Sequence, residues 1–234
     1  MIDQHESHNK IIFQRSHSPK KGVYMKNLLV SLLTVSTLIA PAIASAKKDK
    51  KAKAASTEQT FKLDTAASSI EWKGTKKVGS FHAGAIKIQE GQITALGEEI
   101  KSGQILVDMK TITNTDLTDA EYNKKLVTHL SSADFFNVEK NPTSTFKFTS
   151  VTAGKNKGEY TVKGELTFIG QTNPVEFPAV VKFDKEQVSG EATLKLDRTK
   201  WGLKYGSGNF FKELAGDKII NDEFELKMKL VAKK

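Results

Sequence analysis

The chain has 234 residues, no cysteine, 38% hydrophobic residues and a formal net charge of +9. These values fit one folded domain with extra residues at one end, and the lack of cysteine excludes disulfide bonds. Residues 1–46 carry five basic against two acidic side chains and residues 47–57 carry five lysines against one aspartate, which leaves +2 for the rest. Because the folded part is nearly neutral, the charge does not indicate nucleic-acid binding.

The N-terminal part has the pattern of an export signal. A charged start at Met25 precedes an apolar run over residues 28–40 and the triplet Ala44-Ser45-Ala46, as in a secretory signal peptide. The run is shorter than the roughly 20 residues that span a bilayer, and no cysteine follows it for a lipid anchor. We therefore expect a periplasmic or secreted protein. The predicted parts are an upstream extension (1–24), a signal peptide (25–46), a lysine-rich disordered leader (47–57) that can contact anionic lipids transiently, and a β domain (58–234).

Residues after Thr57 form a series of runs in which apolar and polar residues alternate. In EYTVKGELTFIG (159–170) every second side chain is apolar or glycine, which predicts a strand with one dry face. The other predicted runs are 69–74, 84–89, 104–109, 145–151, 175–183, 188–197 and 224–231. Turns are predicted at 90–91, 155–158, 171–174 and 184–186. The spacing favours an antiparallel barrel of about eight strands, with a sandwich as the alternative.

One helix is predicted between the strands at 104–109 and 145–151. Thr118 and Glu121 have the spacing of a capping box, and the helix should run over about residues 119–130. Its apolar face is predicted to hold Tyr122, Leu126 and His129, with Leu130 beside them. A long loop at 199–220 joins the last two strands, and loops of this length are often functional.

Small residues recur on the predicted inner faces, at Gly164, Ala179, Gly190 and Ala192. A solid core would use larger side chains, because empty volume costs stability. Two interpretations remain open: the small residues leave an apolar cavity, or they fit a tapering barrel and its bends. A ligand on such inner faces should be long and apolar, because these faces carry almost no charge.

Few residues suggest catalysis. After the predicted signal peptide only His82 and His129 remain, with no spacing that indicates a zinc site. Nucleophile, phosphate-binding and dinucleotide-binding motifs are absent from the sequence. Arg198 ends an apolar strand and needs a partner, which is either a nearby carboxylate or a ligand head group.

Six ordered motifs resemble the YceI-like family. They are WKGTK (72–76), GSFHAG (79–84), HLSSADFFNVEKNPTSTFKFTSV (129–151), YTVKGELTFIGQTNPVEFP (160–178), LDRTKWGLKYGSG (196–208) and IINDEFELKMKLVA (219–232). The resemblance implies an exported bacterial protein with a lipocalin-like antiparallel barrel that holds a polyisoprenoid or similar long-chain lipid. It implies no cofactor and no enzymatic activity, and it leaves a homodimer open.

The resemblance also implies where a ligand would lie. The residues expected along its tail are Trp72, Ile86, Phe146, Phe148, Leu166, Phe168, Phe177, Leu194, Phe224 and Met228. Those expected at the mouth and head group are His82, His129, Asp134, Phe135, Phe136, Arg198, Trp201 and Tyr205. Phe135 and Phe136 are expected to be largely buried and to plug or line the mouth, with Pro142 setting the turn into the strand from Thr145.

Two other functions remain as alternatives. A filled barrel would act through its surface as a structural or stress-response domain. An enzyme acting on a lipid would need His82 or His129 as an acid or base inside the barrel.

Overall fold

The computed structural model describes residues 57–234. The predicted upstream extension, signal peptide and nearly all of the lysine-rich leader lie outside these residues. The strands are β1 Glu58–Leu63, β2 Ser69–Lys76, β3 Phe81–Leu96, β4 Glu99–Asp108, β5 Thr143–Ala153, β6 Glu159–Phe168, β7 Gln171–Phe183, β8 Gln187–Asp197 and β9 Ile220–Lys233. The helices are the 3-10 turns η1 Met109–Thr111 and η2 Arg198–Trp201, and the α-helix α1 Ala120–Ser131.

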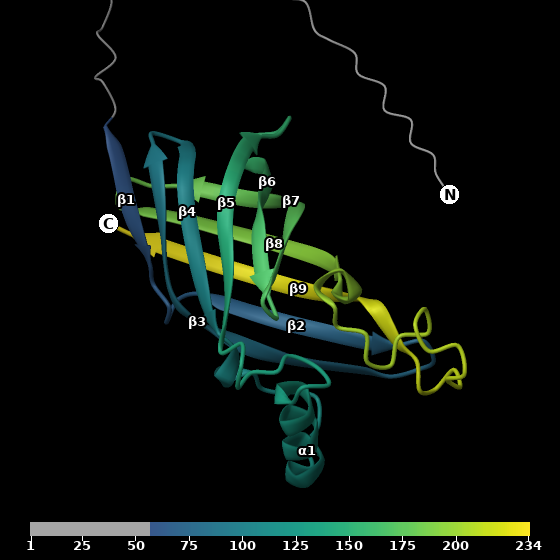
Figure 1. Ribbon diagram of the computed structural model, residues 1–234. Coiled ribbons are helices and arrows are strands. Elements are labelled where there is room, and N and C mark those ends of the chain that lie inside the picture. The colour runs from purple at the N-terminus through teal and green to yellow at the C-terminus, as the bar shows by residue number, and fades with distance from the viewer. Residues whose placement is uncertain (1–56) are drawn as a thin grey trace, which may run out of the picture. The chain divides into compact units, whose positions relative to one another are not determined.

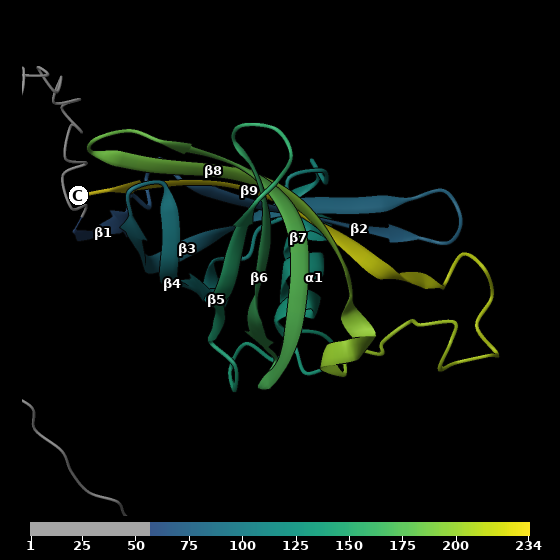
Figure 2. The ribbon, with the colours of Figure 1, turned by 90° about the horizontal axis from the view of Figure 1, so that it is seen from above.

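The strands form one closed antiparallel barrel (Figure 1). Eight positions follow one another around it, because β1 and β2 share a single position between β3 and β9. β2 pairs with the first half of β3 and β1 with its last residues, while β4 closes the barrel along the other edge of β3. This confirms the predicted barrel of about eight strands. The β2–β3 hairpin and the 199–220 loop extend beyond the barrel in both views (Figure 1, Figure 2).

Two of the four predicted turns are wrong. Glu90 and Gly91 lie inside β3, where the pairing with β4 shifts register, and a Cβ at Gly91 would lie 2.8 Å from the Gln104 carbonyl oxygen. The glycine therefore marks close backbone approach rather than a chain reversal. The second error is at 171–174, which already belongs to β7. The β6–β7 reversal is the two-residue turn Ile169–Gly170, in which both residues have positive φ.

Period-two alternation correctly predicted the inner faces. Val162 and Phe168 of β6, Phe177 and Val181 of β7, and Val188 of β8 are among the buried core side chains. β5 begins at Thr143 rather than Thr145, directly after Pro142.

α1 lies at one end of the barrel and starts one residue later than predicted (Figure 1). Its N-cap is Asp119, whose carboxylate accepts hydrogen bonds from the backbone N–H groups of Glu121 and Tyr122. The predicted capping box, with Thr118 as the N-cap, is therefore wrong. Tyr122 is 64% exposed, and Leu130 is the buried residue of this helix. Among the helices of residues 57–234, none has the length and apolar character needed to cross a membrane.

Candidate functional site

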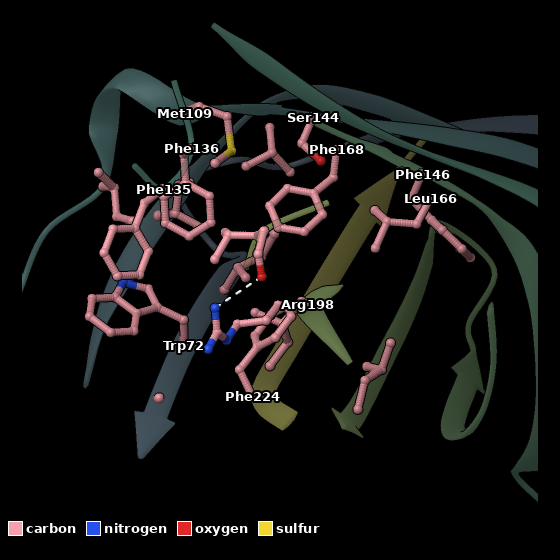
Figure 3. A pocket seen from close by; sticks show the side chains of 18 of the residues that line it. Trp72, Met109, Phe135, Phe136, Ser144, Phe146, Leu166, Phe168, Arg198 and Phe224 are labelled. Atoms are coloured by element: carbon pink, nitrogen blue, oxygen red, sulfur yellow. Dashed lines mark hydrogen bonds between the residues drawn. The ribbon is translucent and has the colours of Figure 1, made fainter. Parts of the chain in front are cut away.

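A cavity of about 180 Å³ lies inside the barrel, toward the end that α1 occupies. Its wall is almost entirely apolar and comes from the inner faces of the strands and from the connections that follow β4 and β8. Figure 3 shows aromatic rings from several elements converging on it, with the Arg198 side chain among them. Such a space excludes water and suits an apolar ligand.

The tail positions expected from the sequence lie on this cavity with one exception. Phe148 lines a second cavity of about 50 Å³ instead. The two cavities share wall residues, namely Ile105, Phe146, Phe177 and Met228. They are therefore neighbours in one apolar interior. The nine expected residues on the larger cavity are Trp72, Ile86, Phe146, Leu166, Phe168, Phe177, Leu194, Phe224 and Met228.

The small inner residues have two different roles. Ala179, Gly190 and Ala192 line the smaller cavity, which agrees with the cavity interpretation. Gly164 instead makes room for its neighbours: a Cβ there would lie 2.5 Å from the Lys147 carbonyl oxygen and would overlap the Phe146 ring. Both of the interpretations left open by the sequence therefore apply, at different positions.

Phe135 and Phe136 line the cavity where α1 ends, and both rings are half-buried rather than largely buried. The Phe136 ring lies 5.6 Å from that of Phe168, which is an inner-face residue. Phe135 lies 5.1 Å from Tyr205 of the 199–220 loop, measured between ring centroids. The pair thus bridges the barrel interior and the outer loop.

Arg198 contacts the cavity but is fully occupied by the protein. Its guanidinium donates to the backbone carbonyls of residues 203, 205, 220 and 221 and to the carboxylate of Asp222. An arginine side chain has five N–H donors, so none remains for a head group. Burial lowers the pKa of Arg198, and the charges of Asp222 and Asp197 oppose this. The prediction that Arg198 binds the head group of a ligand is therefore replaced by a structural role, in which Arg198 holds the 199–220 loop in place.

His82 faces a polar cluster and does not line the cavity. Its Nδ1 lies 2.8 Å from Asp116, which also accepts from the backbone N–H of Ala83 and from Asn114. Burial acts to raise the pKa of Asp116, but these hydrogen bonds outweigh it and hold the pKa below its usual value. Asn114 is itself buried and also donates to the Ala83 carbonyl. The cluster therefore joins the segment after η1 to the start of β3 through hydrogen bonds.

His129 lies outside the cavity, beside the mouth. Its ring makes edge contacts with Phe135 and Tyr205, and its Nε2 lies 3.1 Å from Asp134. Trp201 does not line the cavity either; it is 1% exposed, and its indole donates to the Leu166 carbonyl. The structure thus places Phe135, Phe136 and Arg198 on the cavity, and the other five predicted mouth residues around it.

Some wall residues were missed because they belong to irregular connections. Ile112 and Leu203 are buried and line the cavity, yet neither lies in an alternating run. Met109 ends the apolar run QILVDM, so the sequence did contain a signal for it. Within residues 57–234, no cluster of three or more His, Asp or Glu side chains could hold a metal ion.

The fold and the site define a closed antiparallel barrel around an apolar interior. Comparison with known proteins identifies the family to which this barrel belongs. The family profile of the YceI-like domain matches residues 61–232, and the chain belongs to the YceI-like family. A UPF0312 protein of Pseudomonas putida strain GB-1 is 34% identical over 143 residues, which are 58% of this chain and 70% of that protein. A UPF0312 protein of Shewanella denitrificans is 31% identical over 156 residues, covering 66% and 72%.

Two solved structures share the fold. BcnA of Burkholderia cenocepacia has a TM-score of 0.57 and 24% identity, covering 73% of this chain and 99% of BcnA. A polyisoprenoid binding domain from Saccharophagus degradans, implicated in plant cell wall breakdown, also has a TM-score of 0.57, with 15% identity over 74% of this chain and 97% of that domain. At these identities the likeness concerns the barrel architecture.

Proposed function

We propose that the protein is an exported lipid-binding protein that carries or sequesters a long-chain polyisoprenoid or similar amphiphile. The observation that carries this proposal is the apolar cavity inside the barrel. Each methylene group moved from water into such a space contributes roughly 0.8 kcal/mol. The name of the polyisoprenoid binding domain with the same fold supports this ligand class.

The cavity volume limits how the ligand is held. An apolar cavity of about 150 Å³ accommodates one benzene molecule, so the 180 Å³ space encloses only a short part of a long tail. A longer tail requires the side chains between the two cavities, such as Phe146 and Met228, to move apart. The remainder of the tail leaves through the mouth beside Phe135 and Phe136.

The polar end of the ligand then lies outside the wall. The polar side chains that contact the larger cavity are Ser144, Arg198 and Asn221, and each already donates to other protein groups. Specificity in the interior therefore comes from shape and apolar area. Export is part of the same proposal and is supported by the signal-peptide pattern at residues 25–46.

Native mass spectrometry of protein purified from the periplasm, followed by organic extraction, tests the proposal. A defined isoprenoid should be recovered from the wild type. Leu166→Trp fills the cavity and should abolish recovery, whereas Glu165→Trp places the same ring on the outer face of β6 as a matched control. A wild-type protein that is reproducibly empty and takes up no added polyprenyl lipid contradicts the proposal.

The alternatives have less support. A filled barrel is disfavoured by the cavity itself. Acid–base chemistry on an enclosed lipid would need a histidine in the wall, and the two histidines of residues 57–234 lie outside it.

A further inference from the structure

Exposed apolar side chains gather at one place on the described part of the protein. We define the mouth tips as residues 73–81, the end of the β2–β3 hairpin, and residues 204–220, the loop before β9. Seven large hydrophobic side chains in residues 57–234 are exposed, and five of them lie on the mouth tips. These five are Val78, Phe81, Tyr205, Phe210 and Phe211. Clustered exposure of this kind marks an interaction surface.

The two tips lie side by side. The backbone N–H of Lys77 donates to the Ile219 carbonyl at 2.9 Å, and Lys76 is paired with Ile220. Both views show the hairpin and the loop projecting together away from the barrel (Figure 1, Figure 2). Their apolar side chains are therefore available to one partner at the same time.

The tips also concentrate positive charge. They contain six lysines and two acidic side chains, a net charge of +4, whereas residues 58–234 as a whole carry only +2. The rest of the domain is thus −2. Two of the lysines lie over exposed rings, with 4.6 Å from Lys73 Nζ to the Phe81 ring and 4.6 Å from Lys204 Nζ to the Phe210 ring. Rings and cations occupy the same surface.

This surface adjoins the cavity mouth. Gly74 and Ile220, at the bases of the two tips, line the cavity, and so does Leu203 just before the second tip. Tyr205 contacts the Phe135 ring, which lines the same cavity. A partner bound to the tips would therefore lie next to the place where the tail enters.

We propose that the mouth tips bind the surface of a bilayer that contains anionic lipids. Exposed rings with lysines around them match the boundary between acyl chains and head groups, where rings insert and lysine stems carry their charges toward the phosphates. A partner surface without negative charge would leave the lysines without counter-charges, and one without an apolar layer would leave the rings exposed to water. Bilayer docking is measured without any cavity ligand, so it stands or fails separately from the proposed carrier function.

Site-specific labelling provides the first test. The chain has no cysteine, so Val78→Cys accepts a single environment-sensitive fluorophore at the tips, and Val180→Cys is the matched control on an exposed residue of β7. Vesicles of phosphatidylethanolamine and phosphatidylglycerol should shift the emission of the label at residue 78 to the blue and leave that at residue 180 unchanged. Equal shifts at both positions, or none at residue 78, overturn the proposal.

Co-sedimentation of the protein purified from the periplasm with the same vesicles provides the second test. Phe81→Ala, Phe210→Ala and Phe211→Ala together should weaken partitioning about tenfold or more, because inserted aromatic area is lost. Replacing Lys76, Lys77, Lys212 and Lys218 by Gln should weaken it by roughly fivefold for each lysine that faces the surface. The charge control, with three lysines instead of four, replaces Lys155, Lys157 and Lys185 by Gln, in turns outside the tips, and should change partitioning little.

Two outcomes would contradict bilayer docking. Unchanged sedimentation of the ring variant would show that the three rings do not insert into the bilayer. A label shift at residue 78 that rises with protein concentration without vesicles, together with a doubled mass by analytical ultracentrifugation, would assign the tips to a second copy of the chain instead.

Discussion

Two connections meet at the cavity mouth, and they are held in different ways. The η2 segment (residues 198–220) is fastened by Arg198 and by the fully buried Trp201 and Ser207. The α1 segment (residues 109–142) is held near its start by the polar cluster of Asn114 and Asp116, and farther along by the packing of the buried Leu130 and Val138, while its rings at the mouth are half-buried. Because buried hydrogen bonds hold the η2 segment, we expect it to be the fixed side of the mouth, and we expect the half-buried rings that follow α1 to be the movable side.

The largest expected effect is on the fixed side. Arg198→Met removes the donor to four backbone carbonyls and to Asp222 Oδ1, which should lower the free energy of unfolding by about 3–5 kcal/mol. Urea unfolding, monitored by circular dichroism, measures this loss of stability. Lys200→Met, at an exposed neighbour, should change stability by less than about 0.5 kcal/mol. Similar losses in both variants would show that Arg198 does not fasten the loop.

The next effect concerns the movable side. Phe135→Ala with Phe136→Ala should lower the free energy of unfolding by about 2–4 kcal/mol. Each half-buried ring contributes less to stability than a fully buried one, because less of its apolar surface is removed from water. The same variant should release a bound polyprenyl lipid about tenfold faster, since the mouth loses its apolar rim. Stopped-flow transfer to acceptor vesicles measures the rate. Tyr122→Ala, on the exposed face of α1, should leave release unchanged.

A smaller, pH-dependent effect is expected at the start of the α1 segment. Asp116→Asn should lower stability by about 1–2 kcal/mol at neutral pH. Because the folded pKa of Asp116 lies below the ordinary 3.8, its carboxylate stabilises the fold fully above pH 3.8, and this contribution is lost as the pH falls through the folded pKa. The difference between wild type and variant should therefore shrink at pH 3. A constant difference in urea unfolding from pH 7 to pH 3 would contradict the assignment, with Asp184→Asn in an exposed turn as the control.

The smallest effect is expected at His129. Its pairing with Asp134 is largely solvent-exposed, and such pairs contribute about 0–1 kcal/mol. His129→Gln should therefore lower the free energy of unfolding by less than about 1 kcal/mol, as measured by thermal unfolding. A larger loss would mean that the ring contacts with Phe135 and Tyr205 hold the mouth in place.

The sequence predicted what depends on local alternation. Inner-face residues such as Leu166, Phe168 and Phe177 follow from a period of two, which the pleat of each strand imposes directly. The role of Arg198 could not be resolved in the same way, because four of its acceptors are backbone carbonyls whose positions depend on the path of the whole η2 segment. The turn errors have a similar origin, since Gly91 signals a chain reversal and a bulged strand equally well.

The pairing of β9 also sets when the barrel can close during synthesis. β9 is the last strand and forms the wall between β2 and β8, with further pairs to β1. Until residues 220–233 are made, β2 and β8 both present unpaired edges, and the apolar interior faces water along that gap. Contacts such as Lys62 with Lys233 join distant parts of the chain, which makes closure a late and slow event. The nascent domain therefore passes through an aggregation-prone stage that ends only when its final strand inserts.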